Sequence, residues 1–243
     1  MSLTADLRAA LDPAALFEQA FGLEPLDWQR AYLRETGPAV VLKGRQVGAS
    51  LAAAALAIHA ANYAADVNVV IVSPSLKQST EITTKARIGL RSLGARLIQD
   101  STSTLRLANG SRLLSLPGTA RSVRGWTAEL LILDEAAFIS PETWTAARAL
   151  VATGGRLVVQ STPALEDGDF HELVTGDDDA WARFTVRSDE VPTISAAFLE
   201  SERRSMSPDD FGSEYECRFG KAGAALFSPE RINALFPSED AVA

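Results

Sequence analysis

The segment Val-Val-Leu-Lys-Gly-Arg-Gln-Val-Gly-Ala-Ser, residues 40–50, decides the fold of this chain. It begins as an apolar run and leads through a glycine-containing turn into an alanine-rich stretch, which predicts a buried strand, a loop and a helix. The standard phosphate-binding loop between such elements has the pattern Gly, four residues, then Gly-Lys-Ser/Thr. Aligned on Gly48 and Ser50, the chain has Ala49 in place of that lysine and Lys43 in place of the first glycine. We therefore interpret the segment as a phosphate-binding loop whose lysine is displaced.

Each part of this loop has a physical role in binding phosphate. The first backbone amides of a helix point towards the preceding loop, and Gly44 and Gly48 let the backbone approach an anion without a Cβ in the way. Ser50, in the first helical turn, is placed to bind Mg²⁺ through its hydroxyl. A cation near the terminal phosphates is supplied by Lys43 or by Arg45, and the sequence leaves that choice open.

A second motif, Leu-Leu-Ile-Leu-Asp-Glu at residues 130–135, predicts the acidic half of the same site. Its apolar residues indicate a buried strand, and open α/β sheets bind ligands at the carboxyl ends of their strands. We expect Asp134 to hold Mg²⁺ through water and Glu135 to orient and polarise the attacking water. The segment Ser161-Thr162-Pro163 follows a further apolar strand and is placed to sense the γ-phosphate by hydrogen bonding.

Apolar runs and helical patterns alternate along the chain, which predicts an α/β fold with a parallel sheet and helices on both faces. We expect residues 166–179, which contain seven acids, to form a loop. Strands are expected at 39–42, 67–72, 96–99, 104–107, 112–116, 130–133, 156–160 and 181–186, and helices after Asp12, at 25–34, 49–65, after Ser75 to Leu93, 141–150 and 195–220.

The bulk composition fits one large domain of 243 residues, 47% of them apolar. The longest apolar stretch, Leu51–Ile58, is far shorter than a membrane span, and no signal pattern precedes it, so we expect a cytosolic protein with no membrane contact. Cys217 is the only cysteine, which excludes an intrachain disulfide. The net charge of −8 opposes non-specific binding of nucleic acid, but residues 77–124 hold nine Lys and Arg against two acids and leave a local basic face possible.

The order of Trp28-Gln29, Arg45-Gln46-Val47-Gly48, the acidic strand and Ser161-Thr162-Pro163 resembles the ATPase domain of large terminase subunits, the motors of tailed-phage DNA packaging. The resemblance runs from about Pro25 to Phe236, and some members of the family carry the loop lysine at the start of the loop, as this chain does. It implies a RecA-like (ASCE-type) P-loop NTPase with a mainly parallel central sheet. Its catalytic glutamate is expected on the strand next to the one that precedes the loop.

The resemblance also implies an activity and partners. The domain would hydrolyse ATP with Mg²⁺ and so power the translocation of double-stranded DNA into a procapsid. It would be a monomer in isolation and would assemble as a homo-oligomeric ring, a pentamer, with the portal protein and the small terminase subunit. This activity belongs in the host cytoplasm, transiently on the portal of the procapsid.

Carried over by position, the resemblance assigns roles to single residues. Gln29 would contact adenine with Trp28 packing nearby, and Ser161 and Thr162 would couple hydrolysis to movement. The loop residues expected around the nucleotide are Lys43, Gly44, Arg45, Gln46, Val47, Gly48, Ala49 and Ser50, with Ser50 and Asp134 on the magnesium and Glu135 on the water.

Two arginines before the acidic strand, Arg121 and Arg124, are candidates for an arginine finger. The resemblance favours Arg124, acting on the ATP of a neighbouring subunit. Such a residue neutralises charge on the transferring phosphoryl group. The predicted catalytic residues are therefore Glu135, Arg124 and Lys43.

We expect residues 1–226 to form the ATPase domain with an N-terminal helical segment, and residues 227–243 to begin a linker to a nuclease domain that the sequence does not contain. No nuclease activity is expected of this chain. Two other functions remain open. A helicase-like DNA-dependent ATPase shares the Asp-Glu strand and the glutamine before the loop, but it needs a second motor domain. A nucleotide-binding assembly module without turnover would explain Ala49 as the mark of an inactive site.

Overall fold

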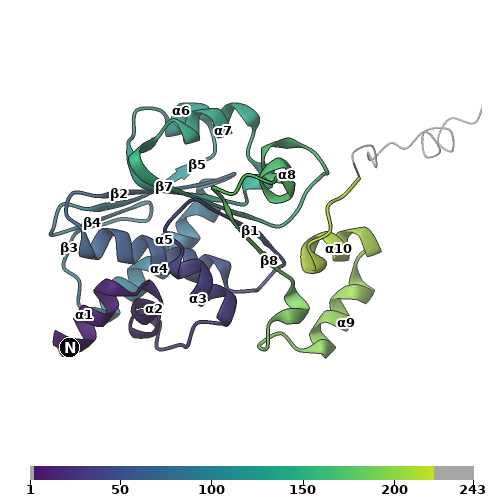
Figure 1. Cartoon of the computed structure of the whole chain (residues 1–243), viewed down its shortest axis with the longest axis horizontal. Helices are drawn as coiled ribbons and strands as arrows, with labels where there is room; N and C mark the ends of the chain where they lie inside the picture. Colours follow the sequence, from purple (N-terminus) through teal and green to yellow (C-terminus); the bar gives the residue numbers. More distant parts are fainter. Residues whose placement is uncertain (1–2, 222–243) are drawn as a thin grey trace, which may run out of the picture.

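An eight-stranded sheet forms the centre of the molecule, in the order β3-β4-β5-β2-β6-β7-β1-β8 (Figure 1). The computed structural model describes residues 3–221. Neighbouring strands from β5 to β8 pair in parallel, whereas β3 and β4 extend the sheet in antiparallel fashion beside β5. The mainly parallel sheet predicted from the sequence is confirmed. The strands are β1 (Ala39–Lys43), β2 (Asn68–Ser73), β3 (Leu97–Asp100), β4 (Thr104–Leu107), β5 (Arg112–Pro117), β6 (Ala128–Asp134), β7 (Val151–Ser161) and β8 (Ala182–Val186).

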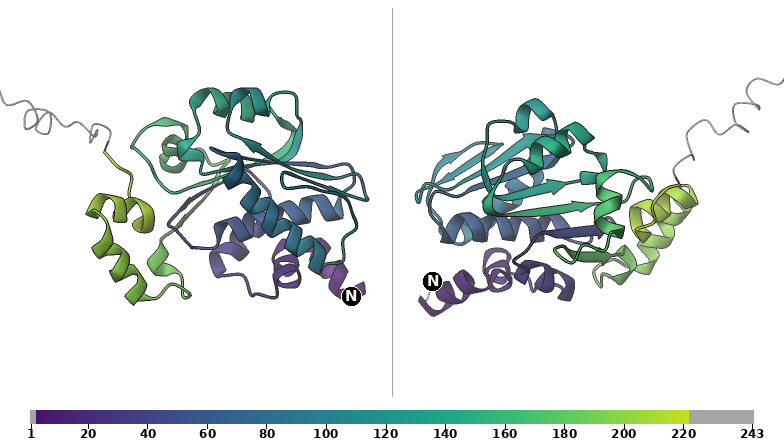
Figure 2. Two further views of the ribbon diagram at one scale, coloured as in Figure 1. Left: turned by 180° about the vertical axis from the view of Figure 1, so that it is seen from behind. Right: turned by 45° about the horizontal axis from the view of Figure 1, so that its top comes forward.

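Helices cover both faces of this sheet (Figures 1 and 2). One face carries α1 (Leu3–Leu11), α2 (Pro13–Phe21), α3 (Asp27–Arg34), α4 (Ala49–Tyr63) and α5 (Leu76–Ser92). The other face carries α6 (Ala120–Val123), α7 (Pro141–Arg148) and α8 (Gly168–Thr175). The helices α9 (Ala196–Ser205) and α10 (Pro208–Glu216) lie to one side, beyond the carboxyl ends of β1 and β8.

Alternate residues of the central strands enter two separate hydrophobic cores. Val41 and Ile132 belong to the core under α4 and α5, whereas Val40 and Leu131 belong to the core under α7 and α8. Because side chains alternate across a strand, a strand covered on both faces must be apolar at every position. This is why these strands read as uninterrupted apolar runs in the sequence.

The order of the strands differs from one expectation. Strand β7 lies between β6, which ends at Asp134, and β1, which precedes the loop. The prediction that the catalytic glutamate follows the strand next to the loop strand is therefore wrong. Each of the three strands contains a short run that is buried on both faces, so their composition gave no information on which of them would be neighbours.

Three helical regions also differ from the expectations. The acidic segment expected to be a loop contains α8, whose Phe170, Leu173 and Val174 pack on the second core. The single helix expected at 195–220 is two helices, because Ser207 caps a new helix that begins with Pro208. The sequence did not predict α1 or α6, and residues 227–243 lie outside the described part of the chain.

No helix within residues 3–221 combines the length and the apolar character needed to cross a membrane.

Candidate nucleotide-binding site

The loop between β1 and α4 presents free backbone amides at the carboxyl edge of the sheet. The N–H groups of Gln46, Val47 and Gly48 have no hydrogen-bond partner among residues 3–221. Ala49 and Ser50 are the first two residues of α4, where an N–H has no acceptor within its own helix. These five amides lie at the positive end of the helix dipole, and together they can bind an anion. The geometry fits the predicted phosphate-binding loop.

Gln29 fixes the conformation of this loop. Its Nε2 donates a hydrogen bond to the carbonyl of Gly48 at 3.1 Å, and its Oε1 accepts one from the backbone of Leu26 at 2.9 Å. Gly48 has a left-handed backbone (φ 87°), and a Cβ there would lie only 2.6 Å from Nε2 of Gln29. The predicted contact of Gln29 with adenine stays a prediction. Trp28 is half-buried and packs against the core under α4 and α5.

Gln29 contacts the end of the loop, whereas the start of the loop is held by hydrogen bonds to β8 and α10. The backbone N–H of Gly44 donates to Val186 at 2.8 Å, and that of Arg45 donates to Glu214 at 2.7 Å. The side chain of Arg45 also forms an ion pair with the carboxylate of Glu214. A Cβ at Gly44 would lie 2.9 Å from the carbonyl oxygen of Tyr215, so the close packing requires a glycine. Of the two candidate cations, Arg45 is therefore engaged with α10.

Lys43 extends across the carboxyl edge of the sheet to the acidic motif. Its Nζ lies 2.7 Å from Oε1 of Glu135, and the lysine side chain is only 9% exposed. Lys43 ends β1 and Glu135 directly follows β6, and β7 lies between these strands, so the lysine side chain spans the intervening strand. The displaced lysine thus reaches the centre of the site.

The other carboxylate oxygen of Glu135 faces the third motif. Its Oε2 lies 3.3 Å from Oγ of Ser161, 3.4 Å from the backbone nitrogen of Thr162 and 3.5 Å from Oγ1 of Thr162. Glu135 has a left-handed backbone (φ 52°), which is a strained conformation for a glutamate and is typical of functional sites. The three motifs identified in the sequence therefore meet at one carboxylate.

Asp134 is the more deeply buried acid of the pair. Burial, followed by the negative charge of Glu135, raises the pKa of Asp134 to about 6, although Lys43 and the hydrogen bond from Gln160 act in the opposite direction. Nε2 of Gln160 donates to Oδ1 of Asp134 at 2.7 Å. Perturbed carboxylates of this kind are common in catalytic and metal-binding sites.

The residues present fit a magnesium ion. The hydroxyl of Ser50 makes no hydrogen bond with residues 3–221, and it lies in the first turn of the helix that follows the loop. Asp134 ends its strand at the same edge of the sheet. One hydroxyl, one carboxylate and the oxygen atoms of a phosphate are ligands that Mg²⁺ prefers.

The candidate arginine fingers lie away from this cluster. Arg121 and Arg124 are exposed on and after α6, and neither side chain has a partner among residues 3–221. The strand before α6 is β5, which is separated from β1 by β2, β6 and β7. With neighbouring strands about 4.8 Å apart, this separation is about 19 Å. The strand that leads to the two arginines and the strand that leads to the loop are therefore not neighbours in the sheet.

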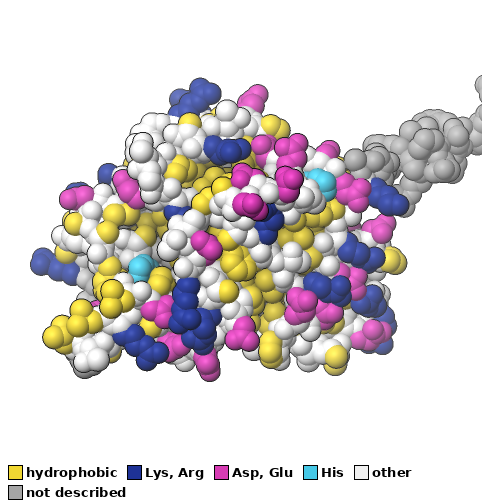
Figure 3. Space-filling view, viewed as in Figure 1, with side chains coloured by type: hydrophobic (Ala, Val, Ile, Leu, Met, Phe, Trp, Pro, Cys, Tyr) yellow, Lys and Arg dark blue, Asp and Glu magenta, His cyan; other side chains and the backbone are white. Residues whose placement is uncertain are grey.

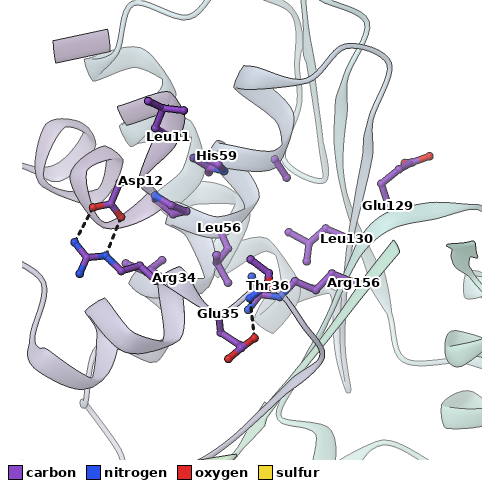
Figure 4. Close-up of a pocket in the computed structure, with 13 residues that line it drawn as sticks. Leu11, Asp12, Arg34, Glu35, Thr36, Leu56, His59, Glu129, Leu130 and Arg156 are labelled. Carbon is purple, nitrogen blue, oxygen red and sulfur yellow. Dashed lines mark hydrogen bonds and ion pairs between the residues drawn. The ribbon is translucent and has the colours of Figure 1, made fainter. Parts of the chain in front are cut away.

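A hollow of about 460 Å³ lies at the opposite end of the strands, away from the loop (Figure 4). It is bounded by the Asp12–Arg34 ion pair, by His59 and by Leu130 and Arg156, which are paired neighbours on β6 and β7. None of the residues predicted from the sequence to bind nucleotide lines it. The candidate site is therefore defined by the motifs at the carboxyl edge and not by the size of a cavity.

The sheet order, the loop on α4 and the acids at the end of β6 define a P-loop NTPase of the RecA-like type, as predicted. Residues 40–234 match the family model described as the large terminase subunit, T4likevirus-type, N-terminal. The match covers most of the chain, and the chain belongs to this family of DNA-packaging motors. The resemblance stated from the motifs is confirmed.

Solved structures of large terminases share the fold. The Thermus phage P74-26 large terminase ATPase domain has a TM-score of 0.72 at 22% identity, over 86% of this chain and 99% of that chain. The large terminase of the thermophilic bacteriophage D6E in complex with ADP has a TM-score of 0.66 at 14% identity, over 84% of this chain and 52% of that one. The HK97 bacteriophage large terminase has a TM-score of 0.60 at 16% identity, over 83% and 50%. No curated protein sequence matches the chain significantly.

Two supporting residues of the site were not found from the sequence. Gln160 was assigned only to a buried strand, although a glutamine in an apolar run directly before Ser161 is itself a signal. Glu214 comes from α10, far along the chain, and no local pattern indicates that it would face Arg45.

Proposed function

We propose that this domain is a Mg²⁺-dependent ATPase whose hydrolysis cycle drives double-stranded DNA into a procapsid. The loop amides and Lys43 bind the phosphates, and Ser50 and Asp134 hold the magnesium. Glu135 orients the attacking water, and Ser161 and Thr162 transmit the change at the γ-phosphate. The D6E terminase was solved with ADP, which supports a nucleotide ligand for this chain as well.

One observation carries the proposal. The Glu135 carboxylate contacts Lys43 on one side and Ser161 and Thr162 on the other, beside a loop with free amides. A nucleotide whose terminal phosphate draws Lys43 to itself would release Oε1 of Glu135, and that oxygen could then accept a proton from water. The Glu135 carboxylate would in this way respond to nucleotide binding through Lys43, take part in hydrolysis, and contact the coupling segment through Ser161 and Thr162.

The finger is supplied by a neighbouring copy of the chain. The loop and the two arginines follow strands that lie about 19 Å apart in the sheet, which supports a finger that acts between subunits. A ring, by resemblance a pentamer, would bring Arg124 of one subunit to the loop of the next. The isolated chain would be a monomer with weak turnover.

The partners follow from the same family. Six basic residues of the 77–124 region make no ion pair among residues 3–221: Lys77, Arg96, Arg106, Arg112, Arg121 and Arg124. Apart from Arg124, which is proposed as the finger, they are the first candidates for phosphate contacts with DNA. Figure 3 shows cationic side chains interspersed with acids on one face, rather than a uniform basic surface. The portal protein and the small terminase subunit complete the assembly, in the host cytoplasm.

Turnover of ATP tests the proposal directly. We expect phosphate release that requires Mg²⁺ and that rises with protein concentration and with portal-bearing procapsids. Nucleotide binding without turnover, even at high protein concentration with DNA, would favour the assembly module. Strand separation without portal-dependent packaging would favour the helicase-like ATPase.

The same preparation tests the predicted lack of nuclease activity. Residues 3–221 contain no cluster of three or more His, Cys, Asp or Glu that could hold a metal ion. We expect plasmid DNA to stay intact with Mg²⁺ or Mn²⁺, and robust cleavage would contradict this part of the proposal.

A further inference from the structure

Three polar side chains stand in a row on neighbouring strands at the carboxyl edge of the sheet. Asp134 of β6 is paired in register with Gln160 of β7. The register of β2 and β6 pairs Val72 with Leu133, so that Ser73 is the next neighbour of Asp134 on the other side. Residues two positions earlier on these strands, which point to the same face of the sheet, belong to the core under α4; Ile132 is one of them. The row therefore faces the helix that carries the phosphate-binding loop.

Two oxygen atoms of this row are buried without a partner. Ser73 and Gln160 have no exposed surface, and neither Oγ of Ser73 nor Oε1 of Gln160 has a hydrogen-bond partner within residues 3–221. A buried polar group without a hydrogen-bond partner destabilises the folded state. Two such atoms on either side of one buried carboxylate are not explained by packing, since valine or leucine would fill these positions in a core.

The position of Oε1 is fixed by the other half of the same amide. Nε2 of Gln160 is held on Oδ1 of Asp134 at 2.7 Å, and Oε1 is bonded to the same carbon atom as Nε2. The unpartnered oxygen must therefore lie in the immediate surroundings of the Asp134 carboxylate. This arrangement offers an acceptor, a hydroxyl and a charged oxygen within one small region.

We propose that Gln160, together with Ser73, positions the hydration shell of the magnesium ion. The amide nitrogen of Gln160 fixes the rotamer of Asp134, and Oε1 accepts a hydrogen bond from a magnesium-bound water. The hydroxyl of Ser73 binds the shell from the opposite side. Mg²⁺ keeps several of its waters in protein sites, and groups that orient such a shell commonly change metal affinity by about 10–100-fold. The proposal rests on the proposed function of this site as a Mg²⁺–nucleotide site.

The test measures the magnesium requirement of ADP binding and needs no turnover. A fluorescent ADP analogue at fixed concentration is titrated with Mg²⁺ for the wild type, Gln160→Met and Ser73→Ala, and its affinity is also measured in EDTA. Methionine keeps the unbranched length of glutamine but has neither amide group. We expect the half-maximal Mg²⁺ concentration to rise about 10-fold in Gln160→Met and by less in Ser73→Ala. The affinity in EDTA should be unchanged in both.

Ser115→Ala is the matched control. Ser115 is a buried serine on β5, the strand next to β2. Its hydroxyl is hydrogen-bonded to the hydroxyl of Thr83 and to the carbonyl of Ser79. It should leave the magnesium requirement unchanged. An unaltered requirement in both site variants, or equal losses with Mg²⁺ and in EDTA, would overturn the proposal. If Gln160→Met does not fold, Ser73→Ala carries the test alone. A wild type that binds no ADP at all would instead contradict the proposed function.

Discussion

Nζ of Lys43 lies 2.7 Å from Oε1 of Glu135, so the displaced lysine contacts the acidic motif directly. A lysine in the usual position of the loop would stand at the start of α4, whereas this one stands at the end of β1 and extends over β7. The ion pair holds the glutamate that is proposed to orient the water. We therefore expect a phosphate that binds Lys43 to change the contacts of the Glu135 carboxylate.

Lys43→Ala should weaken both nucleotide binding and turnover, because it removes the cation proposed for the phosphates and the partner of Glu135. Loss of such a buried partner also leaves a carboxylate uncompensated, so a lower melting temperature is expected. Isothermal titration with ADP and a phosphate-release assay measure the two effects. Arg45→Ala is the control, since Arg45 is paired with Glu214 and should retain most of the activity. Wild-type turnover in Lys43→Ala would exclude the role of the displaced lysine.

Glu135→Gln should abolish turnover and retain ATP binding. The amide keeps the shape of the side chain and its contacts with Ser161 and Thr162, but it cannot accept a proton from water. Loss of a positioned general base commonly reduces the rate by about 10²–10⁴-fold. Single-turnover phosphate release beside equilibrium ATP binding separates the two functions. An equal loss of phosphate release and of ATP binding would indicate a structural role for Glu135.

The sequence predicted the elements of the central sheet because each is a short apolar run that ends in residues with a specific chemistry. Strand β1 ends in the loop, β6 ends in Asp134 and β7 ends in Ser161. Strand order could not be predicted, because β1, β6 and β7 each contain an apolar run buried on both faces. Any order of the three strands would give the same pattern of apolar residues in the sequence. The acidic segment was wrongly predicted as a loop because its charges concealed the apolar spacing of Phe170, Leu173 and Val174.

Local motifs also indicated most of the candidate site, but not the contacts between them. The ion pair of Lys43 with Glu135 joins residues that are 92 positions apart in the chain. Its formation depends on the strand order and on the length of one side chain, which no local pattern contains. Gln160 is a comparable case, since its hydrogen bond to Asp134 follows from the register of β6 and β7.

Asp134→Asn should stabilise the nucleotide-free protein at neutral pH. Burial raises the pKa of Asp134 from 3.8 to about 6, so the folded state binds the proton more tightly than the unfolded state. The free energy of unfolding of the wild type is therefore expected to fall as pH rises from about 4 to about 6, by a total of about 3 kcal/mol. Asparagine stays uncharged and can still accept the hydrogen bond from Gln160.

Urea unfolding between pH 4 and pH 8 without nucleotide or metal measures this difference. We expect the two proteins to be equally stable near pH 4 and the variant to be more stable above pH 6. The same substitution should remove the effect of Mg²⁺ on ADP binding. Parallel pH profiles for the two proteins would show that the carboxylate of Asp134 carries no charge penalty in the folded state.

Arg124→Ala should abolish turnover without weakening ADP binding to the isolated chain, because the arginine is proposed to act on the loop of a neighbouring subunit. Arginine fingers contribute about 10³–10⁵-fold in rate. Mixing Arg124→Ala with Glu135→Gln subunits under assembly conditions should restore part of the activity, since an intact Arg124 can then act on an intact Glu135 of its neighbour. Arg121→Ala distinguishes the two candidate arginines, since it should leave turnover largely unchanged if Arg124 is the finger. Mixtures as inactive as the separate variants would argue against action between subunits.

Gly48→Ala should lower the free energy of unfolding by more than the cost of placing an alanine in the left-handed conformation of residue 48. Gly94 is also left-handed (φ 73°) and has no atom within 4 Å of an added Cβ, so Gly94→Ala measures the conformational cost, about 1–2 kcal/mol. At Gly48 the added Cβ would lie 2.6 Å from Nε2 of Gln29 and would displace its hydrogen bond to the loop, adding about 1 kcal/mol. A double-mutant cycle with Gln29→Ala isolates this contact, because the extra loss should vanish once the glutamine is removed. Equal effects of Gly48→Ala in both backgrounds would show that Gln29 does not hold the loop.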